Sequence, residues 1–157
     1  MPKTDADWMR LAIEKAREGM INGQTPFGAV ITKHNELVVA AHNVVWATTD
    51  ITAHGEVNAI RLACKALGTI DLSGCTIYSS TEPCPMCFSA IHWAGIEKIF
   101  YGANIADATA AGFNELVISN DDMKRMGQSK VEVIKDFMKK EAQDVFHEFM
   151  KNKGKTY

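Results

Sequence analysis

The order of apolar segments along the chain is the feature that most limits its fold. Two apolar runs, at 27–31 and 37–41, flank a polar turn at 33–36 and predict a β-hairpin. Beyond them, apolar residues at helical spacing alternate with short patterns typical of buried strands. A hairpin followed by strand–helix–strand crossovers predicts a mixed sheet with helices on both of its faces.

The predicted elements account for nearly the whole chain. Helical spacing covers residues 4–20, 52–67, 83–94 and 136–151, with a short and less regular helix within 104–120; the remaining strands cover 75–79, 96–101 and 131–134. The first helix opens with a capping box of Thr4 and Asp7, and Gly68 ends the second. We therefore expect an α/β fold, a three-layer α/β/α sandwich with a mixed five-stranded sheet, formed by residues 1–157 as one domain.

Composition argues against several classes of protein. Seventeen Lys and Arg against nineteen Asp and Glu give a net charge of -2, which disfavours nucleic acid and anionic lipid as partners. No apolar run approaches the ~20 residues that a membrane span needs, and the N-terminus has no signal-peptide pattern, so we expect a cytoplasmic protein without membrane contact. Four cysteines without an export signal favour metal binding or burial over disulfides.

Two motifs with metal-binding side chains begin two of the predicted helices. The sequence His-Gly-Glu stands at 54–56, and Pro-Cys-Pro-Met-Cys stands at 83–87. A Cys-x-x-Cys at a helix start presents two thiolates on one side, where the helix dipole favours negative charge. We expect His54, Cys84 and Cys87 to hold one Zn²⁺ per chain, with the fourth position left open for a water.

Glu56 follows the predicted histidine ligand by two residues, close enough to hydrogen-bond that water. Zinc lowers the pKa of a bound water toward ~7, and a neighbouring carboxylate is a suitable general base. His-x-Glu together with Pro-Cys-x-x-Cys is the known signature of zinc-dependent nucleobase deaminases. Two other interpretations stay open for Cys84 and Cys87: a redox or buried thiol pair, and a closed structural zinc with Cys64 or Cys75 as fourth ligand.

The sequence resembles the cytidine and deoxycytidylate deaminase superfamily over essentially the whole chain, and it is most similar to the bacterial guanine deaminases. The residues that carry the resemblance are Pro26-Phe27-Gly28-Ala29-Val30, Asn43, Thr52-Ala53-His54-Gly55-Glu56, Ser80-Thr81-Glu82-Pro83-Cys84-Pro85-Met86-Cys87, Ala111-Gly112-Phe113-Asn114-Glu115 and Tyr157. The last two groups point to the guanine branch. The resemblance implies hydrolysis of a small purine, guanine, to xanthine and ammonia by a homodimer, in some members with an exchanged C-terminal segment.

The resemblance also implies roles for residues around the metal. Asn43 contacts the edge of the base, Trp93 forms an apolar wall, and Tyr157 closes the pocket. The ring of Phe27 is suited to stacking on a planar base, although core packing explains it equally well from the sequence alone.

Two positions depart from the usual pattern of the family. Gly55 replaces the usual Ala, which removes a methyl group beside the metal and predicts a larger substrate pocket. Glu115 stands where guanine deaminases more often have Asp, and the resemblance implies that it accepts hydrogen bonds from the base and passes a proton to the departing ammonia.

Three rival functions remain from the sequence. A tRNA adenosine deaminase shares both motifs and would need a basic face, for which the residues available are Lys124, Arg125, Lys130, Lys135 and Lys139. The second rival is a deaminase of another small amino-heterocycle or nucleoside, such as guanosine, cytosine or a triazine. The third is a non-catalytic zinc module with a deaminase fold, which the presence of Glu56 disfavours.

Overall fold

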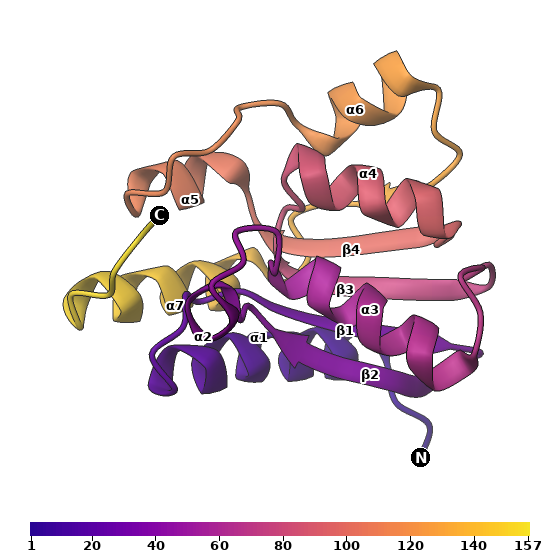
Figure 1. The fold of residues 1–157 in the computed structure, drawn as a ribbon, viewed down its shortest axis with the longest axis horizontal. Helices are drawn as coiled ribbons and strands as arrows, with labels where there is room; N and C mark the ends of the chain where they lie inside the picture. Colours follow the sequence, from indigo (N-terminus) through magenta and orange to yellow (C-terminus); the bar gives the residue numbers. More distant parts are fainter.

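A five-stranded mixed sheet forms the centre of the computed structural model, which describes all 157 residues (Figure 1). Its strand order is β2-β1-β3-β4-β5. Strand β1 (Gly28–Lys33) pairs antiparallel with β2 (Glu36–His42) and with β3 (Cys75–Thr81). Strands β4 (Lys98–Ala103) and β5 (Glu132–Ile134) continue the sheet in parallel pairing. The predicted fold class is therefore confirmed.

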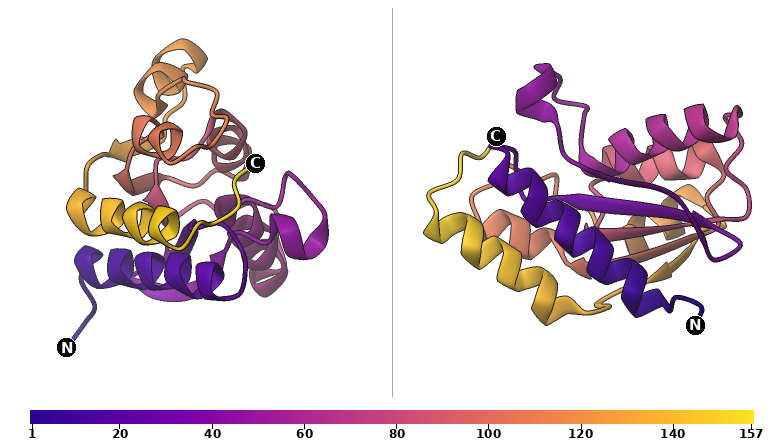
Figure 2. Two further views of the ribbon diagram at one scale, coloured as in Figure 1. Left: turned by 90° about the vertical axis from the view of Figure 1, so that its left-hand side faces the viewer. Right: turned by 90° about the horizontal axis from the view of Figure 1, so that it is seen from below.

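Helices cover both faces of this sheet (Figures 1 and 2). Helices α1 (Asp5–Ile21) and α7 (Lys139–Lys151) lie side by side on one face, and α3 (Gly55–Leu67) and α4 (Pro85–Ala94) lie on the other. The capping box at the start of α1 forms as expected, because Thr4 Oγ1 accepts from the Asp7 amide at 3.2 Å and Asp7 returns a bond to the Thr4 amide at 2.8 Å.

Alternating side chains of the strands fill two separate cores. Val30 of β1 packs among buried residues of α1 and α7, whereas its neighbours Ala29 and Ile31 pack against α3 and α4. This alternation follows from the period of two in a β-strand. Both sides of the central strands are therefore apolar, which explains the continuous apolar runs in the sequence.

The same edge of the sheet carries the starts of several helices. Strands β2 and β3 both run antiparallel to β1, so their carboxyl ends meet at one edge. The chain passes from β2 through the short α2 (Val45–Thr48) to α3, and from β3 directly to α4. His54 is the N-cap of α3 and Cys84 is the N-cap of α4, so the topology brings the two sequence motifs together at this edge.

The region after β4 differs from its prediction. A short helix α5 (Ile105–Ala110) is followed by the non-helical residues 111–119 and then by α6 (Asn120–Gly127), which the sequence pattern did not indicate. Only Asn120 of α6 is buried, and its two apolar side chains, Met123 and Met126, form too short a pattern to predict a helix. No helix combines the length and the apolar character that a bilayer crossing requires.

Candidate metal centre and pocket

The donor atoms of His54, Cys84 and Cys87 converge between the starts of α3 and α4. All three lie within 4.8 Å of one another, with His54 Nδ1 at 3.5 Å from the Cys84 sulfur and at 3.6 Å from the Cys87 sulfur. Bonds of ~2.3 Å to sulfur and ~2.0–2.1 Å to nitrogen in a tetrahedral site separate the two donor types by about 3.6 Å. The donor set therefore fits one zinc ion without rearrangement.

No fourth protein ligand joins this cluster. Cys75 is buried in the core between the sheet and α3 and α4, Cys64 packs against that core, and both lie outside the donor group. All four cysteines are free thiols. Three protein ligands are the arrangement of catalytic zinc sites, which keep one position for water or substrate, whereas closed structural sites have four.

The two cysteines hold their protons very differently. A hydrogen bond from Cys87, together with the nearby His54 ring, lowers the pKa of Cys84 to about 4, whereas burial raises the pKa of Cys87. A divalent cation deprotonates a coordinating thiol, so a bound zinc would favour the thiolate form of both cysteines.

Glu56 lies in the first turn of α3 and is only 4% exposed. The hydroxyl of Ser79 on β3 is 2.7 Å from its Oε1 atom and 2.6 Å from the carbonyl oxygen of Thr81. Burial raises the pKa of the Glu56 carboxyl. The sequence analysis did not single out Ser79, although consecutive hydroxyl residues at 79–81, at the end of an apolar strand, are an available signal.

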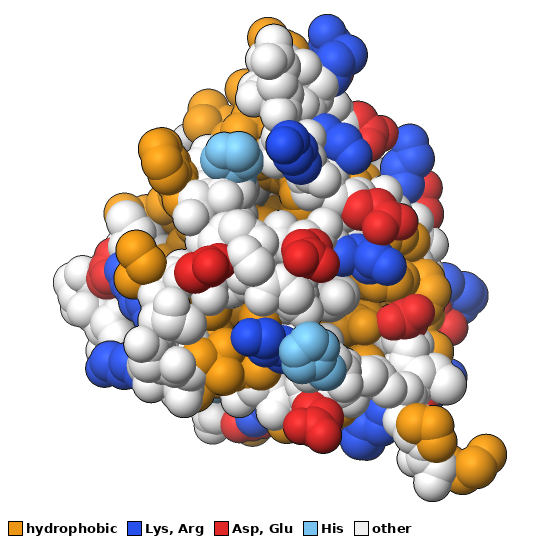
Figure 3. Space-filling view, turned by 90° about the vertical axis from the view of Figure 1, so that its right-hand side faces the viewer, with side chains coloured by type: hydrophobic (Ala, Val, Ile, Leu, Met, Phe, Trp, Pro, Cys, Tyr) orange, Lys and Arg blue, Asp and Glu red, His pale blue; other side chains and the backbone are white.

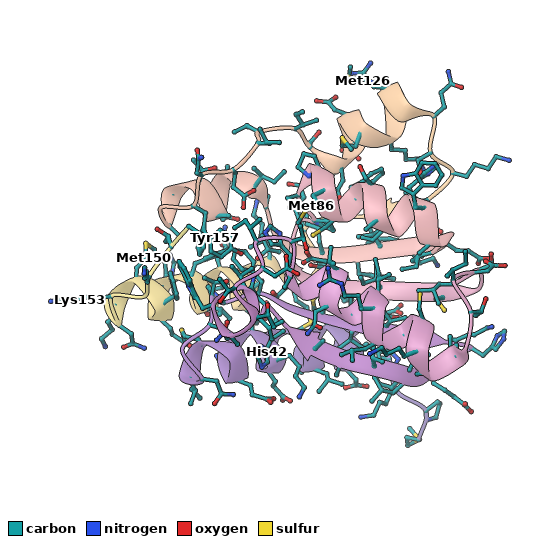
Figure 4. All side chains as sticks on the ribbon, viewed as in Figure 1. His42, Met86, Met126, Met150, Lys153 and Tyr157 are labelled. Atoms are coloured by element: carbon teal, nitrogen blue, oxygen red, sulfur yellow. The ribbon has the colours of Figure 1, made fainter.

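Two neighbouring spaces lie beside these residues and share part of their lining. An outer cavity of about 300 Å³ is lined by Ile51, His54, Cys84, Pro85, Met86, Phe113, Asn114, Glu115, Leu116 and Tyr157. An inner space of about 20 Å³ is lined by Phe27, His54, Glu56, Glu82, Cys84, Glu115 and Tyr157. Figure 4 shows Tyr157 returning from α7 to the side of the molecule where Met86 lies at the start of α4.

Tyr157 lines both spaces in its own chain. Its ring lies 5.6 Å from the His54 ring and 5.4 Å from the Phe113 ring, between ring centroids. Its hydroxyl accepts a hydrogen bond of 2.7 Å from Asn43 Nδ2, and Thr25 Oγ1 lies 3.4 Å away. Burial raises the pKa of this phenol. Tyr157 therefore forms part of the wall of both spaces beside the metal ligand His54.

Phe27 and Glu115 line the inner space beside His54 and Cys84, whereas Asn43 lines neither space and contacts the hydroxyl of Tyr157. Phe27 lines the inner space and packs edge-on against Phe113 at 4.9 Å, so it serves the pocket and the core together. Asn43 is fully buried, and its Oδ1 accepts from the Val45 amide at 3.0 Å. Glu115 lines both spaces, and burial, with the nearby Cys84, raises its pKa to about 7.

Two expected pocket residues do not face the pocket. Trp93 is 86% exposed and lines a separate depression with Phe88 and Met123, because six residues beyond Cys87 are about 1.7 helical turns and bring it to another side of α4. The missing methyl group of Gly55 does not enlarge the pocket either. A Cβ there would lie 3.0 Å from the carbonyl oxygen of Phe27, so glycine allows β1 to pass closely under α3.

Comparisons with known proteins agree with this geometry. Residues 2–103 match the family described as the cytidine and deoxycytidylate deaminase zinc-binding region. Guanine deaminase of Bacillus subtilis (strain 168) is 46% identical over 112 residues, which are 71% of this chain and 72% of that protein. The tRNA-specific adenosine deaminase of the same strain is 40% identical over 99 residues, which are 63% of this chain and 62% of that protein.

A solved structure gives the same result for the fold. Guanine deaminase from Nitrosomonas europaea superposes with a TM-score of 0.85 at 27% identity, covering 93% of this chain and 84% of that one. The zinc ligands fall within residues 2–103, whereas Glu115 and Tyr157 lie beyond them. The chain therefore belongs to the cytidine and deoxycytidylate deaminase family and is a deaminase with that family's zinc-binding region.

Proposed function

We propose that this protein is a zinc-dependent aminohydrolase that converts guanine and water to xanthine and ammonia. The observation that carries the proposal is a second carboxylate, Glu115, which lines the same inner space as Glu56 and the ligand His54. A carboxylate accepts hydrogen bonds but donates none when ionised. Guanine offers two adjacent N–H donors on the edge that bears its amino group, whereas adenine offers a donor beside an acceptor nitrogen, so Glu115 favours guanine.

The base reaches this space only if the tail moves. About 20 Å³ beside Glu56 does not hold a purine, but the outer cavity of about 300 Å³ shares Tyr157 with it as a wall residue. Guanine therefore enters from the outer cavity and displaces the ring of Tyr157 from its place near His54. Asn43 then loses its bond to the Tyr157 hydroxyl and becomes a donor for the base.

Zinc bound by His54, Cys84 and Cys87 would supply the Lewis acidity that makes water a strong nucleophile at neutral pH. Glu56 takes the proton from the attacking water and delivers it to a ring nitrogen, while the oxygen adds to C2. Glu115 orients the base by accepting from its N–H groups as a carboxylate; as the C2–N bond breaks, it takes up the remaining proton of the attacking water from the C2 hydroxyl and gives it to the departing ammonia. Water contributes its oxygen to xanthine, and the C2–N bond to the amino group breaks.

The distribution of charge on the surface disfavours a tRNA adenosine deaminase. Three of the five basic residues considered for an RNA face are paired with acidic neighbours: Arg125 with Asp122 at 3.1 Å, Lys135 with Asp121 at 3.0 Å and Lys139 with Asp136 at 3.5 Å. Figure 3 shows acidic and basic side chains interspersed on the end of the molecule that lies at the right in Figure 1. An RNA-binding enzyme needs a more continuous basic surface.

We also propose that residues 1–157 act as one catalytic domain in a homodimer, as the family resemblance implies. Trp93 on α4 and Met126 on α6 are 86% and 71% exposed, which supports an apolar contact with a second copy. Exchange of the C-terminal segments is not needed to fill the pocket, because Tyr157 reaches the pocket of its own chain. Sedimentation of the zinc-loaded protein and of Trp93→Ala tests the dimer.

Ammonia release from a substrate panel tests the proposed reaction. Purified protein with one zinc per chain is given guanine, guanosine, adenine, cytosine, cytidine or tRNA at matched concentrations. Guanine should be turned over fastest, and Glu115→Gln should keep its zinc and lose most of that rate. Faster turnover of tRNA adenosine or of cytosine would replace guanine as substrate, and no ammonia from any compound would indicate a non-catalytic zinc module.

A further inference from the structure

The buried carboxylate of Glu82 has no part in the reaction described above. Glu82 follows the end of β3 and is 7% exposed. Its Oε1 accepts from the amide of Ile105 at 3.1 Å, and its Oε2 accepts from the amide of Asn120 at 2.9 Å. Both oxygens are thus engaged by backbone donors, so Glu82 is poorly placed to contact a substrate although it lines the inner space.

The two backbone amides belong to the first residues of two helices. Ile105 begins α5 and Asn120 begins α6, so one carboxylate stands at the positive ends of both helix dipoles. Such donors compensate the cost of burying a charged carboxylate. The chain between the two helices is the non-helical stretch 111–119, which carries Glu115.

Further hydrogen bonds join the start of α6, and the end of β4 just before α5, to residues 82–84, which end at the zinc ligand Cys84 and are called the metal loop. The side-chain amide of Asn120, which is fully buried, donates to the carbonyl oxygen of Pro83 at 2.7 Å. The backbone amide of Glu82 donates to the carbonyl oxygen of Ala103, at the end of β4, at 2.7 Å. Since Pro83 directly precedes the zinc ligand Cys84, both ends of the Glu115 segment are joined to the loop that holds the metal.

We propose that Glu82 is a positioning residue that sets the place of Glu115 relative to the zinc ligands by holding the starts of α5 and α6 against the metal loop. The proposal rests on the proposed function, in which Glu115 orients the base. Gln at position 82 keeps the size of the side chain but turns one acceptor into a donor that faces an amide N–H. One of the two helix starts, at Ile105 or Asn120, then loses its hydrogen bond to the side chain at position 82.

Hydrogen exchange and a double-mutant cycle test this role in the zinc-loaded protein. In Glu82→Gln, amide exchange should become at least ~10-fold faster in residues 111–119 and stay unchanged in α7, with zinc still at one per chain. The kcat/KM for guanine should fall roughly 10- to 100-fold. The double variant with Glu115→Gln should be no slower than Glu115→Gln alone, because Glu82 acts through Glu115.

Asp107→Asn is the matched control. The Asp107 carboxylate also accepts at a helix start, from the Asn104 amide at 2.9 Å, and it binds the Gln143 side chain at 3.0 Å, but it makes no bond to the metal loop. This variant should lose stability with kcat/KM within ~2-fold of wild type. If Glu82→Gln folds poorly, Asn120→Ala removes only the bond to Pro83 and should accelerate exchange in the same segment.

Three results would overturn the proposal: unchanged exchange in 111–119, loss of zinc from Glu82→Gln, or rate losses of Glu82→Gln and Glu115→Gln that multiply. These outcomes are separate from failure of the proposed function. If wild type does not deaminate guanine, the exchange measurement still decides whether Glu82 holds the segment. If wild type is active but exchange does not change, only the role of Glu82 fails.

Discussion

The side chain of Asn43 donates a hydrogen bond of 2.7 Å to the hydroxyl of Tyr157, although 114 positions separate the two residues in sequence. Asn43 is fully buried, and its other polar atom is bound to the Val45 amide. A buried amide donor without a partner is costly, so Asn43 exchanges one partner for another and does not stay free. In the proposed function, Tyr157 and the substrate therefore compete for the same donor.

Removing the hydroxyl of Tyr157 should strengthen substrate binding, because the Asn43 amide is then free to donate to the substrate. Tyr157→Phe keeps the ring but leaves Asn43 unpaired in the free enzyme, and one hydrogen bond is worth ~1 kcal/mol, or roughly fivefold in affinity. We expect the KM for guanine to fall by up to ~5-fold with kcat within ~2-fold, together with a lower Tm. A higher KM in steady-state kinetics would mean that the hydroxyl contacts the substrate.

Replacing Glu56 by Gln should separate metal binding from turnover. The variant keeps the size of the buried side chain and leaves all three zinc ligands in place, so zinc should stay at one per chain by elemental analysis. The amide cannot take a proton from water, and kcat should fall by ~10²–10⁴-fold. The exposed Glu36→Gln serves as control, and a Glu56 variant as fast as this control would remove Glu56 from the mechanism.

Ser79→Ala should slow the enzyme without removing its metal. The Ser79 hydroxyl lies 2.7 Å from Glu56 Oε1 and helps to orient that carboxylate. Hydrogen bonds to charged groups contribute ~1.5–3 kcal/mol, so we expect kcat to fall by about tenfold or more. Ser89→Ala is the matched control, since the Ser89 hydroxyl bonds only the Pro85 carbonyl oxygen at 2.8 Å. Equal rates for the two variants would exclude the orienting role.

The raised pKa of Glu115 should make the protein less stable as the pH rises. In the folded protein the pKa is about 7, against an ordinary value of 4.5, because burial and Cys84 disfavour the charge. The folded state then binds more protons than the unfolded state between these values, so stability from this group is full below about 4.5 and is lost as the pH rises through about 7. Thermal unfolding from pH 5 to 8.5 should show this trend in wild type but not in Glu115→Gln, and parallel curves would contradict it.

Local patterns made much of the molecule predictable from its sequence. The hairpin appears as β1 and β2 within a few residues of 27–31 and 37–41, because strand burial leaves apolar runs. His54, Cys84 and Cys87 converge as expected, since both motifs begin helices that follow strands ending at the same edge. Such features depend on spacing within short stretches, which a sequence displays directly.

Features that depend on distant contacts could not be predicted in the same way. Helix α6 packs on α4 and has only two apolar side chains, Met123 and Met126, so its periodic signal is too short to identify a helix from the sequence. The family resemblance places Trp93 at the pocket, although its spacing of six residues from Cys87 already turns it to another side of α4. The bonds of Glu82 are to backbone amides 23 and 38 positions away, and a backbone amide has no residue type to recognise.

The division of the pocket between two parts of the chain has a practical consequence for protein engineering. The metal and Glu56 are held by helix starts on the central sheet, whereas Glu115 and Tyr157 come from segments without regular structure, at 111–119 and 152–157. Libraries randomised in these two segments can therefore be screened for deamination of unnatural heterocycles, while the metal ligands and Glu56 stay unchanged in every clone.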